Sequence, residues 1–246
     1  MSEPEAPVFT RTSLITLSAR LVPHRWAWAE ANAAMIAANW ERRRAATPGL
    51  FDGIVLLASS CTISGGHCQV DFFEARYSRF IAFRDAGSPD PAVANAFAAI
   101  VPRTADGAVL LGQMAPGTAN AGQVYFPCGT PDAGDVRDGG VVDLAGSAER
   151  EFREETGLTL PASAAQAPWT LLQGDGQFAF LRPVRFEARA DALKARIAQN
   201  HAGEAEPELS RMICVRRPDD IDHARMPPFV RAYLDGLFAA RDLAAG

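Results

Sequence analysis

The sequence lacks the features that would place it in several special classes of protein. Nowhere do about 18 consecutive apolar residues occur, so no segment is predicted to cross a membrane as a helix. Basic residues are not in excess. The formal net charge is -5, which disfavours nucleic acid as the main partner. The first residues, MSEPEAPVF, are not a basic stretch followed by an apolar one, so we expect no secretory signal and a cytoplasmic location.

Cysteine is also scarce, with four residues in a chain of 246, and no two of them have the CxxC spacing of a structural zinc site. Cys61, His67 and Cys68 lie around a Gly-Gly turn and are metal ligands in principle, but a fourth ligand is not evident. We therefore favour a hairpin with buried thiols at this place.

The hydrophobic content of 48% is sufficient for one large or two small domains with real cores. A cluster of turn-forming residues, DAGSPDP at 85–91, is the best candidate for a boundary. We predict a small α+β domain over residues 1–88 and a second domain over residues 89–246.

Hydrophobic patterning predicts an α/β protein. In the first domain we expect a strand over 8–21, a helix over 26–44, and a hairpin or meander over 53–63 and 67–83. In the second we expect strands over 92–103, 108–114, 168–173, 177–188 and 211–217, and helices over 143–156, 191–200 and 228–240.

The helix predicted over 143–156 carries the only cluster of residues that points to a particular chemistry. Asp143 is a plausible N-cap and Gly157 suits the left-handed position after the last turn. On this helix Glu151, Glu154 and Glu155 stand at positions i, i+3 and i+4, and therefore share one face.

Three neighbouring carboxylates repel one another unless a cation lies among them, and oxygen donors of this kind suit Mg²⁺. The alternative is a solvated surface helix on which Arg150 and Glu154 form an ordinary i,i+4 pair.

The string REFREETGL at 150–158 resembles the second half of the Nudix box, G-x5-E-x7-R-E-U-x-E-E-x-G-U, in which U is a bulky apolar residue. Upstream, GQVYFPCG at 122–129 is similar to the family's G-x-W-x-x-P-G-G entry, and AVLLGQM at 108–114 resembles the strand before it. The resemblance spans residues 95–220. It implies a Nudix-type α/β/α sandwich with a mixed sheet, preceded here by the small α+β domain.

The sequence departs from the Nudix pattern in two places. Cys128 stands where the family has the first of two glycines. The spacing from Gly129 puts Asp135 in place of the first glutamate, but fourteen residues then separate Asp135 from Arg150 where the family has seven. An insertion of about seven residues within VRDGGVVDL accounts for the difference, and either Asp135 or Asp143 is then the substitute carboxylate.

The resemblance implies the role of each site residue. Glu151, Glu154 and Glu155 are expected to hold Mg²⁺, or Mn²⁺ in its place, and Glu151 is an alternative base. Arg150 is expected to orient a glutamate, and Gly129 to line the substrate site. Family members often use a further carboxylate from a downstream loop. The loop here offers Glu204, Glu206 and Glu208, among which we name Glu206 as the catalytic candidate.

The expected activity is hydrolysis of the diphosphate linkage in a nucleoside diphosphate joined to another group, of which a nucleotide sugar is one example. The alternative is a catalytically degenerate Nudix-fold protein that senses nucleotides or acts as a scaffold, as the altered first half of the box suggests. The N-terminal segment is expected to border the nucleotide site, or else to serve in homodimer formation or stability.

Overall fold

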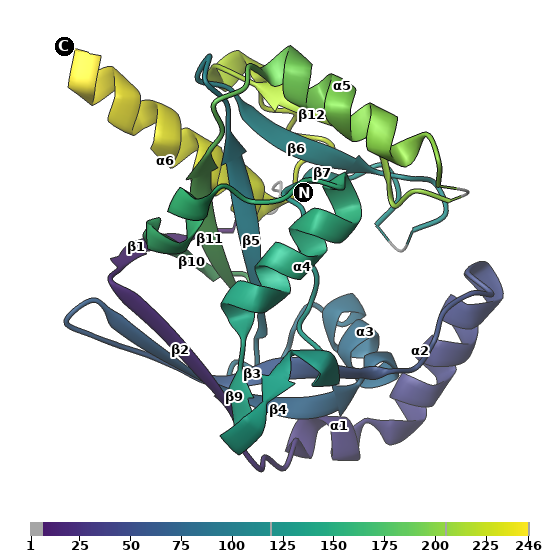
Figure 1. Cartoon of the computed structure of the whole chain (residues 1–246). Helices are drawn as coiled ribbons and strands as arrows, with labels where there is room; N and C mark the ends of the chain where they lie inside the picture. The colour runs from purple at the N-terminus through teal and green to yellow at the C-terminus, as the bar shows by residue number, and fades with distance from the viewer. Residues whose placement is uncertain (1–6, 119, 205, 246) are drawn as a thin grey trace, which may run out of the picture.

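The computed structural model describes residues 7–118, 120–204 and 206–245, with side chains described as far as Arg241. Two mixed β-sheets and six α-helices make up this part of the chain, which is therefore an α/β protein (Figure 1). No helix in the described ranges has both the length and the apolar character needed to cross a lipid bilayer.

The larger sheet has seven strands in the order β1-β10-β11-β5-β6-β12, with β7 paired to β6. Its parallel pair is β11 with β5, and the other pairs are antiparallel. Its strands are β1 (Thr10–Leu14), β5 (Asn95–Arg103), β6 (Val109–Met114), β7 (Val124–Tyr125), β10 (Trp169–Gly174), β11 (Gln177–Arg185) and β12 (Leu209–Val215). β5 is buried along nearly its whole length, as expected for a central strand.

The smaller sheet has five strands in the order β3-β4-β2-β9-β8, in which β2 and β4 are parallel. Its strands are β2 (Thr16–Leu21), β3 (Ile54–Ser64), β4 (His67–Arg76), β8 (Val136–Arg137) and β9 (Val141–Val142). The hairpin of β3 and β4 turns at Gly65 and Gly66, both of which have a positive φ. Cys61 and Cys68 lie on this hairpin with their sulfur atoms 3.5 Å apart, both as free thiols.

The α-helices are α1 (Ala27–Ala31), α2 (Ala33–Ala46), α3 (Tyr77–Asp85), α4 (Leu144–Thr156), α5 (Ala190–His201) and α6 (Pro228–Ala245). Short 3-10 turns lie at η1 (Ala133–Asp135), η2 (Asp138–Gly140), η3 (Ala162–Gln166) and η4 (Pro218–Asp220). α4 packs against β5, and α6 packs against β10 and reaches β5 through Phe229, whose ring meets that of Phe97 edge-on.

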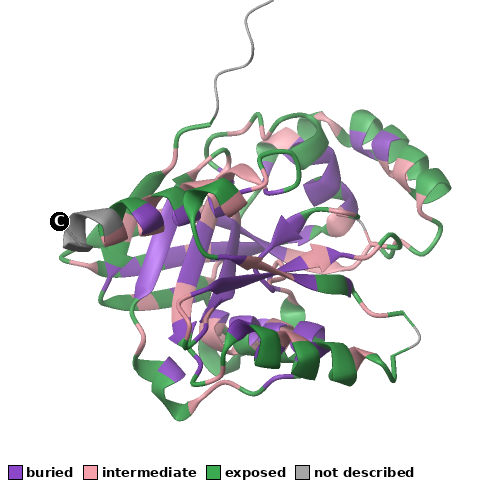
Figure 2. Cartoon of the chain, turned by 90° about the horizontal axis from the view of Figure 1, so that it is seen from above, coloured by how far each residue is buried: buried purple, intermediate pink, exposed green. Residues whose placement is uncertain are grey.

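Buried residues are concentrated on the strands between the flanking helices (Figure 2). One hydrophobic cluster joins both sheets and α4, since Leu56 and Phe72 of the smaller sheet belong to the same cluster as Ile100 and Phe152. A second cluster, centred on Trp26 and other aromatic residues, fills the space between the smaller sheet and the helices α1–α3.

Strand pairing crosses the boundary that the sequence suggests near residue 88. β1 comes from the N-terminal segment and pairs with β10 over five residues of the larger sheet. In return, β9 from the C-terminal segment pairs with β2 of the smaller sheet. Each segment thus contributes strands to both sheets, and the division into domains of 1–88 and 89–246 stays a prediction.

Three of the predicted elements are wrong in detail. The helix expected over 26–44 is two helices, α1 and α2, which are separated at Asn32. The single strand expected over 8–21 is two strands, β1 and β2, which diverge at Ile15 into different sheets. The strand expected over 67–83 ends at Arg76 and continues as the helix α3. Asp52, far away in sequence, accepts hydrogen bonds from the backbone N–H of Ser78 at 2.7 Å and from its hydroxyl at 3.0 Å. This remote carboxylate satisfies the first turn of α3, which local propensity does not reveal.

Candidate active site

The helix α4 carries the predicted site residues, and its two ends are formed as the sequence indicates. Asp143 is the N-cap, and its carboxylate accepts a hydrogen bond from the N–H of Gly146 at 2.8 Å. Gly157 ends the helix at φ 66°, in the left-handed region. Between them Leu144, Ala148 and Phe152 form a buried stripe that fixes which face of the helix meets the core.

Glu155 is the most buried of the three glutamates, with 5% of its surface exposed. One carboxylate oxygen, Oε1, accepts a hydrogen bond from the backbone N–H of Cys128 at 3.1 Å. The other oxygen, Oε2, is buried with no hydrogen-bond partner among the described residues. Burial, with the added charges of Glu208 and Glu151, raises the pKa of Glu155 well above its ordinary value. This environment thus disfavours an ionised carboxylate that has no counter-charge, and it would favour one that binds a cation.

Glu151 lies beside Glu155 and against the turn at Gly129. A Cβ atom on Gly129 would stand 2.6 Å from the carboxyl carbon of Glu151, so only glycine allows this approach. Burial raises the pKa of Glu151, and the charge of Arg150 opposes that rise. Glu154, by contrast, has 55% of its side chain exposed and lies at the solvent edge of the group.

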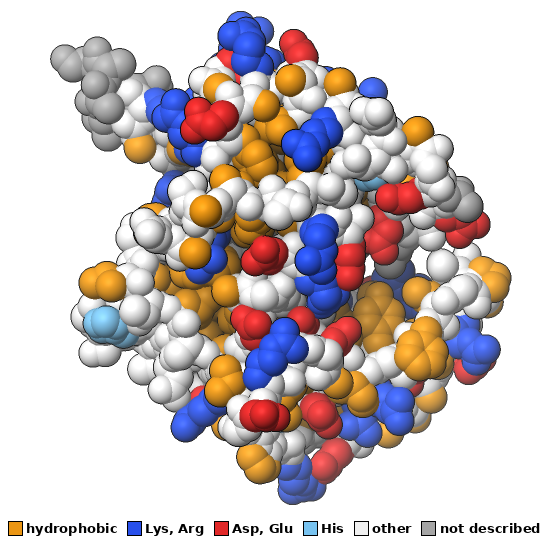
Figure 3. Space-filling view, in the orientation of Figure 1, with side chains coloured by type: hydrophobic (Ala, Val, Ile, Leu, Met, Phe, Trp, Pro, Cys, Tyr) orange, Lys and Arg blue, Asp and Glu red, His pale blue; other side chains and the backbone are white. Residues whose placement is uncertain are grey.

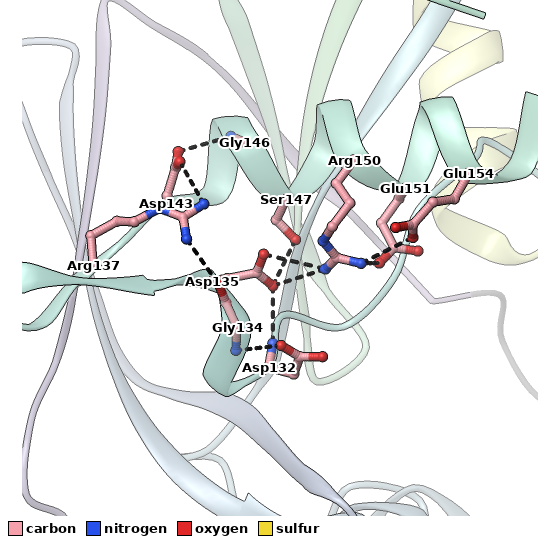
Figure 4. A network of polar contacts seen from close by, with 10 residues as sticks. All are labelled: Asp132, Gly134, Asp135, Arg137, Asp143, Gly146, Ser147, Arg150, Glu151 and Glu154. Carbon is pink, nitrogen blue, oxygen red and sulfur yellow. Dashed lines mark hydrogen bonds and ion pairs between the residues drawn. The ribbon is translucent and has the colours of Figure 1, made fainter. Parts of the chain in front are cut away.

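Arg150 holds the acidic residues of the site together (Figure 4). Its Nη2 donates to both carboxylate oxygens of Asp135 at 3.2 Å. Its Nη1 lies 2.7 Å from Glu151 and 3.1 Å from Glu154. Burial alone would lower the pKa of this guanidinium, but the charges of Glu151 and Asp135 outweigh it and the pKa is raised. Arg150 therefore stays charged while it orients the carboxylates.

The structure places the two candidate substitutes for the first box glutamate in different surroundings. Asp135 is 1% exposed and faces Arg150, and its carboxylate also accepts from the Ser147 hydroxyl at 3.0 Å. Asp143 caps α4 and pairs with Arg137 at 3.3 Å, away from the glutamates (Figure 4). Asp135 is therefore the carboxylate that contacts the arginine of the motif. The residues between Asp135 and Asp143 form β8, η2 and β9, a short hairpin added to the smaller sheet.

The acidic loop before β12 has three exposed glutamates, of which one influences the site. The charge of Glu208 raises the pKa of both Glu155 and Glu151. Its backbone carbonyl accepts from the N–H of Ala115 at 2.8 Å, which anchors it beside the end of β6. Glu206, the residue chosen from the sequence, is exposed, and its catalytic role stays a prediction. The pairing of β12 with β6, which local sequence does not specify, is what places Glu208 beside the end of β6.

A pocket of about 200 Å³ opens beside Cys128 and Gly129, next to the glutamates. Five aromatic rings from four separate parts of the chain line it, namely Tyr77 and Phe80 of α3, Phe97 of β5, Tyr125 of β7 and Phe229 of α6. Its polar lining includes the carboxamides Asn95, Asn120, Gln123 and Gln177 and the guanidinium of Arg84, with no carboxylate. Figure 3 shows a hollow edged by hydrophobic side chains to the right of α4.

Sequence reasoning did not single out most of these pocket residues. Tyr77 and Phe80 come from a segment that was expected to be strand, and Arg84 directly follows it on α3. Asn95 and Gln177 face each other on the paired strands β5 and β11, and Asn120 and Gln123 lie on the loop before β7. No local motif joins them, because tertiary packing alone brings them together. Within the described ranges, no three acidic, histidine or cysteine side chains already converge as a metal site. Arg150 lies between Glu151 and Glu154 and draws them toward itself.

Comparison of the sequence with models of protein families gives no match, and comparison with curated proteins gives no significant match. The residues of the site and their geometry therefore carry the functional conclusion.

Proposed function

We propose that the protein is a Mg²⁺-dependent hydrolase of the Nudix type, which cleaves the diphosphate linkage of a nucleoside diphosphate joined to another group, such as a nucleotide sugar. The observation that carries the proposal is the buried, unpartnered Oε2 of Glu155 within a cluster of three glutamates on α4. A mixed sheet packed against α4 supports the further proposal of a Nudix-type sandwich.

The residues present fit a divalent cation. Glu155 offers a carboxylate oxygen that has no partner among the residues described, and Glu151 is held close by in surroundings that also disfavour an uncompensated charge. Glu151, Glu154 and Glu155 would hold Mg²⁺, or Mn²⁺ in its place. When bound, the ion would neutralise charge on the diphosphate oxygens and lower the pKa of an attacking water.

The other residues of the site position these ligands. Asp135 holds Arg150, which orients Glu151 and Glu154, and the backbone N–H of Cys128 fixes one oxygen of Glu155. A carboxylate of the acidic loop would accept the proton of the attacking water. Glu206 is the residue proposed from the sequence, and the charge of Glu208 at the site favours Glu208 as well.

The pocket beside Gly129 suits the nucleoside part of the substrate. Its aromatic rings offer faces for stacking, and its carboxamides offer both donors and acceptors to the edge of a heterocyclic base. Since α3 supplies Tyr77, Phe80 and Arg84, the N-terminal segment would take part in the choice of substrate.

The second candidate function is nucleotide binding without turnover, by a degenerate Nudix-fold protein that senses nucleotides or acts as a scaffold. The contacts of Arg150 Nη1 with both Glu151 and Glu154 favour it, because an arginine that neutralises two ligands competes with a cation. The burial of Glu155 favours the enzyme, since Arg150 forms no ion pair with that residue in the described structure.

The experiment that tests the proposal is incubation of the full-length protein with nucleotide sugars, dinucleotides and nucleoside triphosphates, each with Mg²⁺, Mn²⁺ or EDTA. We expect release of a nucleoside monophosphate from one class, detected by chromatography, and its loss in EDTA. Binding of the same compounds without cleavage under all metal conditions would instead support the sensor. If the protein neither cleaves nor binds any of these compounds, both proposed functions are contradicted.

A further inference from the structure

A larger hollow, of about 520 Å³, lies at the other end of α4, away from the glutamates. Its walls come from β2, from the hairpin β8–β9, from the first turn of α4 and from β10 and β11. The volume lies in the range of small-molecule sites. Figure 3 shows hydrophobic side chains in the depression between β2 and the start of α4, on the left of that view. The hairpin that lengthens the Nudix-like motif thus builds one side of this hollow.

Arg182 of β11 places a partly buried guanidinium in the wall of the hollow. Its guanidinium stacks on the ring of Trp169, with the central carbon 4.0 Å from the ring centroid. Its Nε is buried without a hydrogen-bond partner, and no ion pair of Arg182 occurs among the side chains described. Leaving a buried, charged donor unsatisfied is unfavourable, so an acceptor in the hollow would be bound strongly.

The other charged groups of the hollow already have partners. Arg20 pairs with Asp71 at 2.7 Å, and Arg137 pairs with Asp143 at 3.3 Å. The carboxylate of Asp143 also accepts a hydrogen bond from the N–H of Gly146 at the start of the helix, where the helix dipole stabilises a negative charge. Burial lowers the pKa of Arg182, and the exposed Glu149 opposes this. The local balance therefore leaves one uncompensated positive charge, on Arg182.

Most of the remaining wall is apolar, with Leu17, Ala19, Val142 and Leu144 beside the Trp169 ring, and Ser18 and Gln69 are its uncharged polar residues. Trp169, Arg182 and Leu17 also line an adjoining hollow of about 630 Å³ along β1 and β2, which has both apolar and polar residues in its wall. An inorganic anion would form a hydrogen bond with the guanidinium of Arg182 but would leave the apolar wall exposed to water. A ligand with an acidic group and an apolar body would match both parts.

We propose that this cavity is a second binding site, for a small organic anion that carries a carboxylate or phosphate on an aliphatic or aromatic body. The acidic group would contact the guanidinium of Arg182, and the body would lie against Trp169 and Leu17. The site is separate from the glutamates, since Ala145 and Glu151 are about 9 Å apart along the helix axis at 1.5 Å per residue. It does not depend on the proposed hydrolase activity.

The test is isothermal titration calorimetry of the full-length protein with octanoate, octyl phosphate, octanol and inorganic phosphate. The first two should bind at least about tenfold more tightly than the last two, because they alone satisfy both the arginine and the apolar wall. Comparison of octanoate with octyl phosphate shows which acidic group the site prefers. Arg182→Gln should weaken binding of the preferred anion by about tenfold to a hundredfold, since a hydrogen bond to a charged group is lost.

Arg185→Gln is the matched control, because it removes the same charge from the same strand at an exposed position of the opposite face. Binding to this variant should be unchanged. If Arg182→Gln does not fold, Ala145→Leu tests the site instead by filling the cavity from a helix position, and it should also abolish binding. Equal affinity for octanoate and octanol, or failure of both anions to bind the wild type, would overturn the proposal. Unchanged binding to both Arg182→Gln and Ala145→Leu would do the same.

Discussion

Glu155 holds its carboxylate in a place where, within the described part of the chain, only one of its two oxygens has a hydrogen-bond partner. A structural carboxylate at 5% exposure would normally have both oxygens satisfied, as Asp135 does through Arg150, Ser147 and the Asp132 N–H. Asp135 and Glu155 are both buried but differ in the hydrogen bonding of their carboxylate oxygens. Asp135 is fully bonded to its neighbours, whereas Glu155 has one oxygen without a partner among the described residues, which would be free to bind the proposed cation.

Removing the charge of a site glutamate should lower activity without lowering stability. We expect Glu154→Gln and Glu155→Gln each to lower kcat by about 10²–10³-fold, because a metal ligand is lost. The melting temperature should stay the same or rise, since like-charge repulsion on α4 decreases. Steady-state kinetics and thermal unfolding of the same preparations measure both effects. Cys128→Ala is the control, because it retains the backbone N–H that donates to Glu155. Wild-type rates in both glutamine variants would refute the assignment.

Gly129 offers a test that leaves every charge in place. In Gly129→Ala the new Cβ would overlap the carboxyl group of Glu151, which must then move. We expect kcat to fall by about tenfold or more while the fold is retained, because small displacements of positioned groups are costly in catalysis. Gly117→Ala should have little effect, since no atom lies within 4 Å of its added Cβ. Equal kinetics for the two variants would show that the approach of Glu151 to Gly129 is unimportant.

At the scale of secondary-structure elements, helices α2 and α3 form a pair that supports the pocket beside Gly129. Asp85, at the end of α3, accepts hydrogen bonds from Asn39 and Arg43 of α2. Asp52 holds the other end of α3. Both contacts fix the helix whose residues Tyr77, Phe80 and Arg84 line the pocket.

The contacts of Asp85 predict how this pair responds to pH. The hydrogen bond from Arg43, followed by that from Asn39, lowers the pKa of Asp85 below its ordinary value. Its contribution to stability is therefore complete above the unfolded-state pKa of about 4, and decreases as the pH falls through the lower folded-state pKa. We expect Asp85→Asn to lower the free energy of unfolding by about 1–2 kcal/mol at pH 7.

Urea unfolding at a series of pH values measures this effect. The difference between wild type and Asp85→Asn should shrink steadily below about pH 4. A difference that is constant from pH 7 to pH 3 would mean that the carboxylate charge is not what holds α2 and α3 together.

At the scale of the whole molecule, the two predicted domains exchange strands. Residues 10–14 form the edge of the larger sheet beyond β10, and residues 136–142 extend the smaller sheet beside β2. The main hydrophobic cluster contains residues of both segments, including Leu14, Phe72, Ile100 and Phe152. The segments are therefore expected to fold together.

We predict that a chain beginning at Ala92 does not fold by itself. It would lose the partner of β10, the partner of β9 and the side of the core that Leu56 and Phe72 supply. Circular dichroism and size-exclusion chromatography should show an aggregated or unfolded species. Co-expression of the pieces 1–91 and 92–246 should restore a soluble complex. A soluble 92–246 chain with a cooperative melt would instead support two independent domains.

The helix α4 shows how much of the site local sequence can predict. Its cap at Asp143, its end at Gly157 and the common face of its glutamates follow from side-chain chemistry and helical spacing, and the structure confirms the first two directly. The α/β class is likewise confirmed, and strands such as β5, β6 and β10 lie close to their expected positions. The Nudix relationship and its chemistry remain proposals.

What the sequence determined by itself, then, is whatever depends on neighbours within one or two turns of chain: the caps and stripe of α4, the turn at Gly65 and Gly66, and the clustering of the acidic residues. Only the tertiary structure decided that Asp135 faces Arg150 and that Asp52 caps α3. It also decided that the charge of Glu208 acts on Glu155, and that the Nε of Arg182 is buried with no hydrogen-bond partner among the described residues. These contacts join residues from separate strands and loops. Their formation depends on sheet pairing and burial, which are set by the free energy of the whole chain rather than by any local segment.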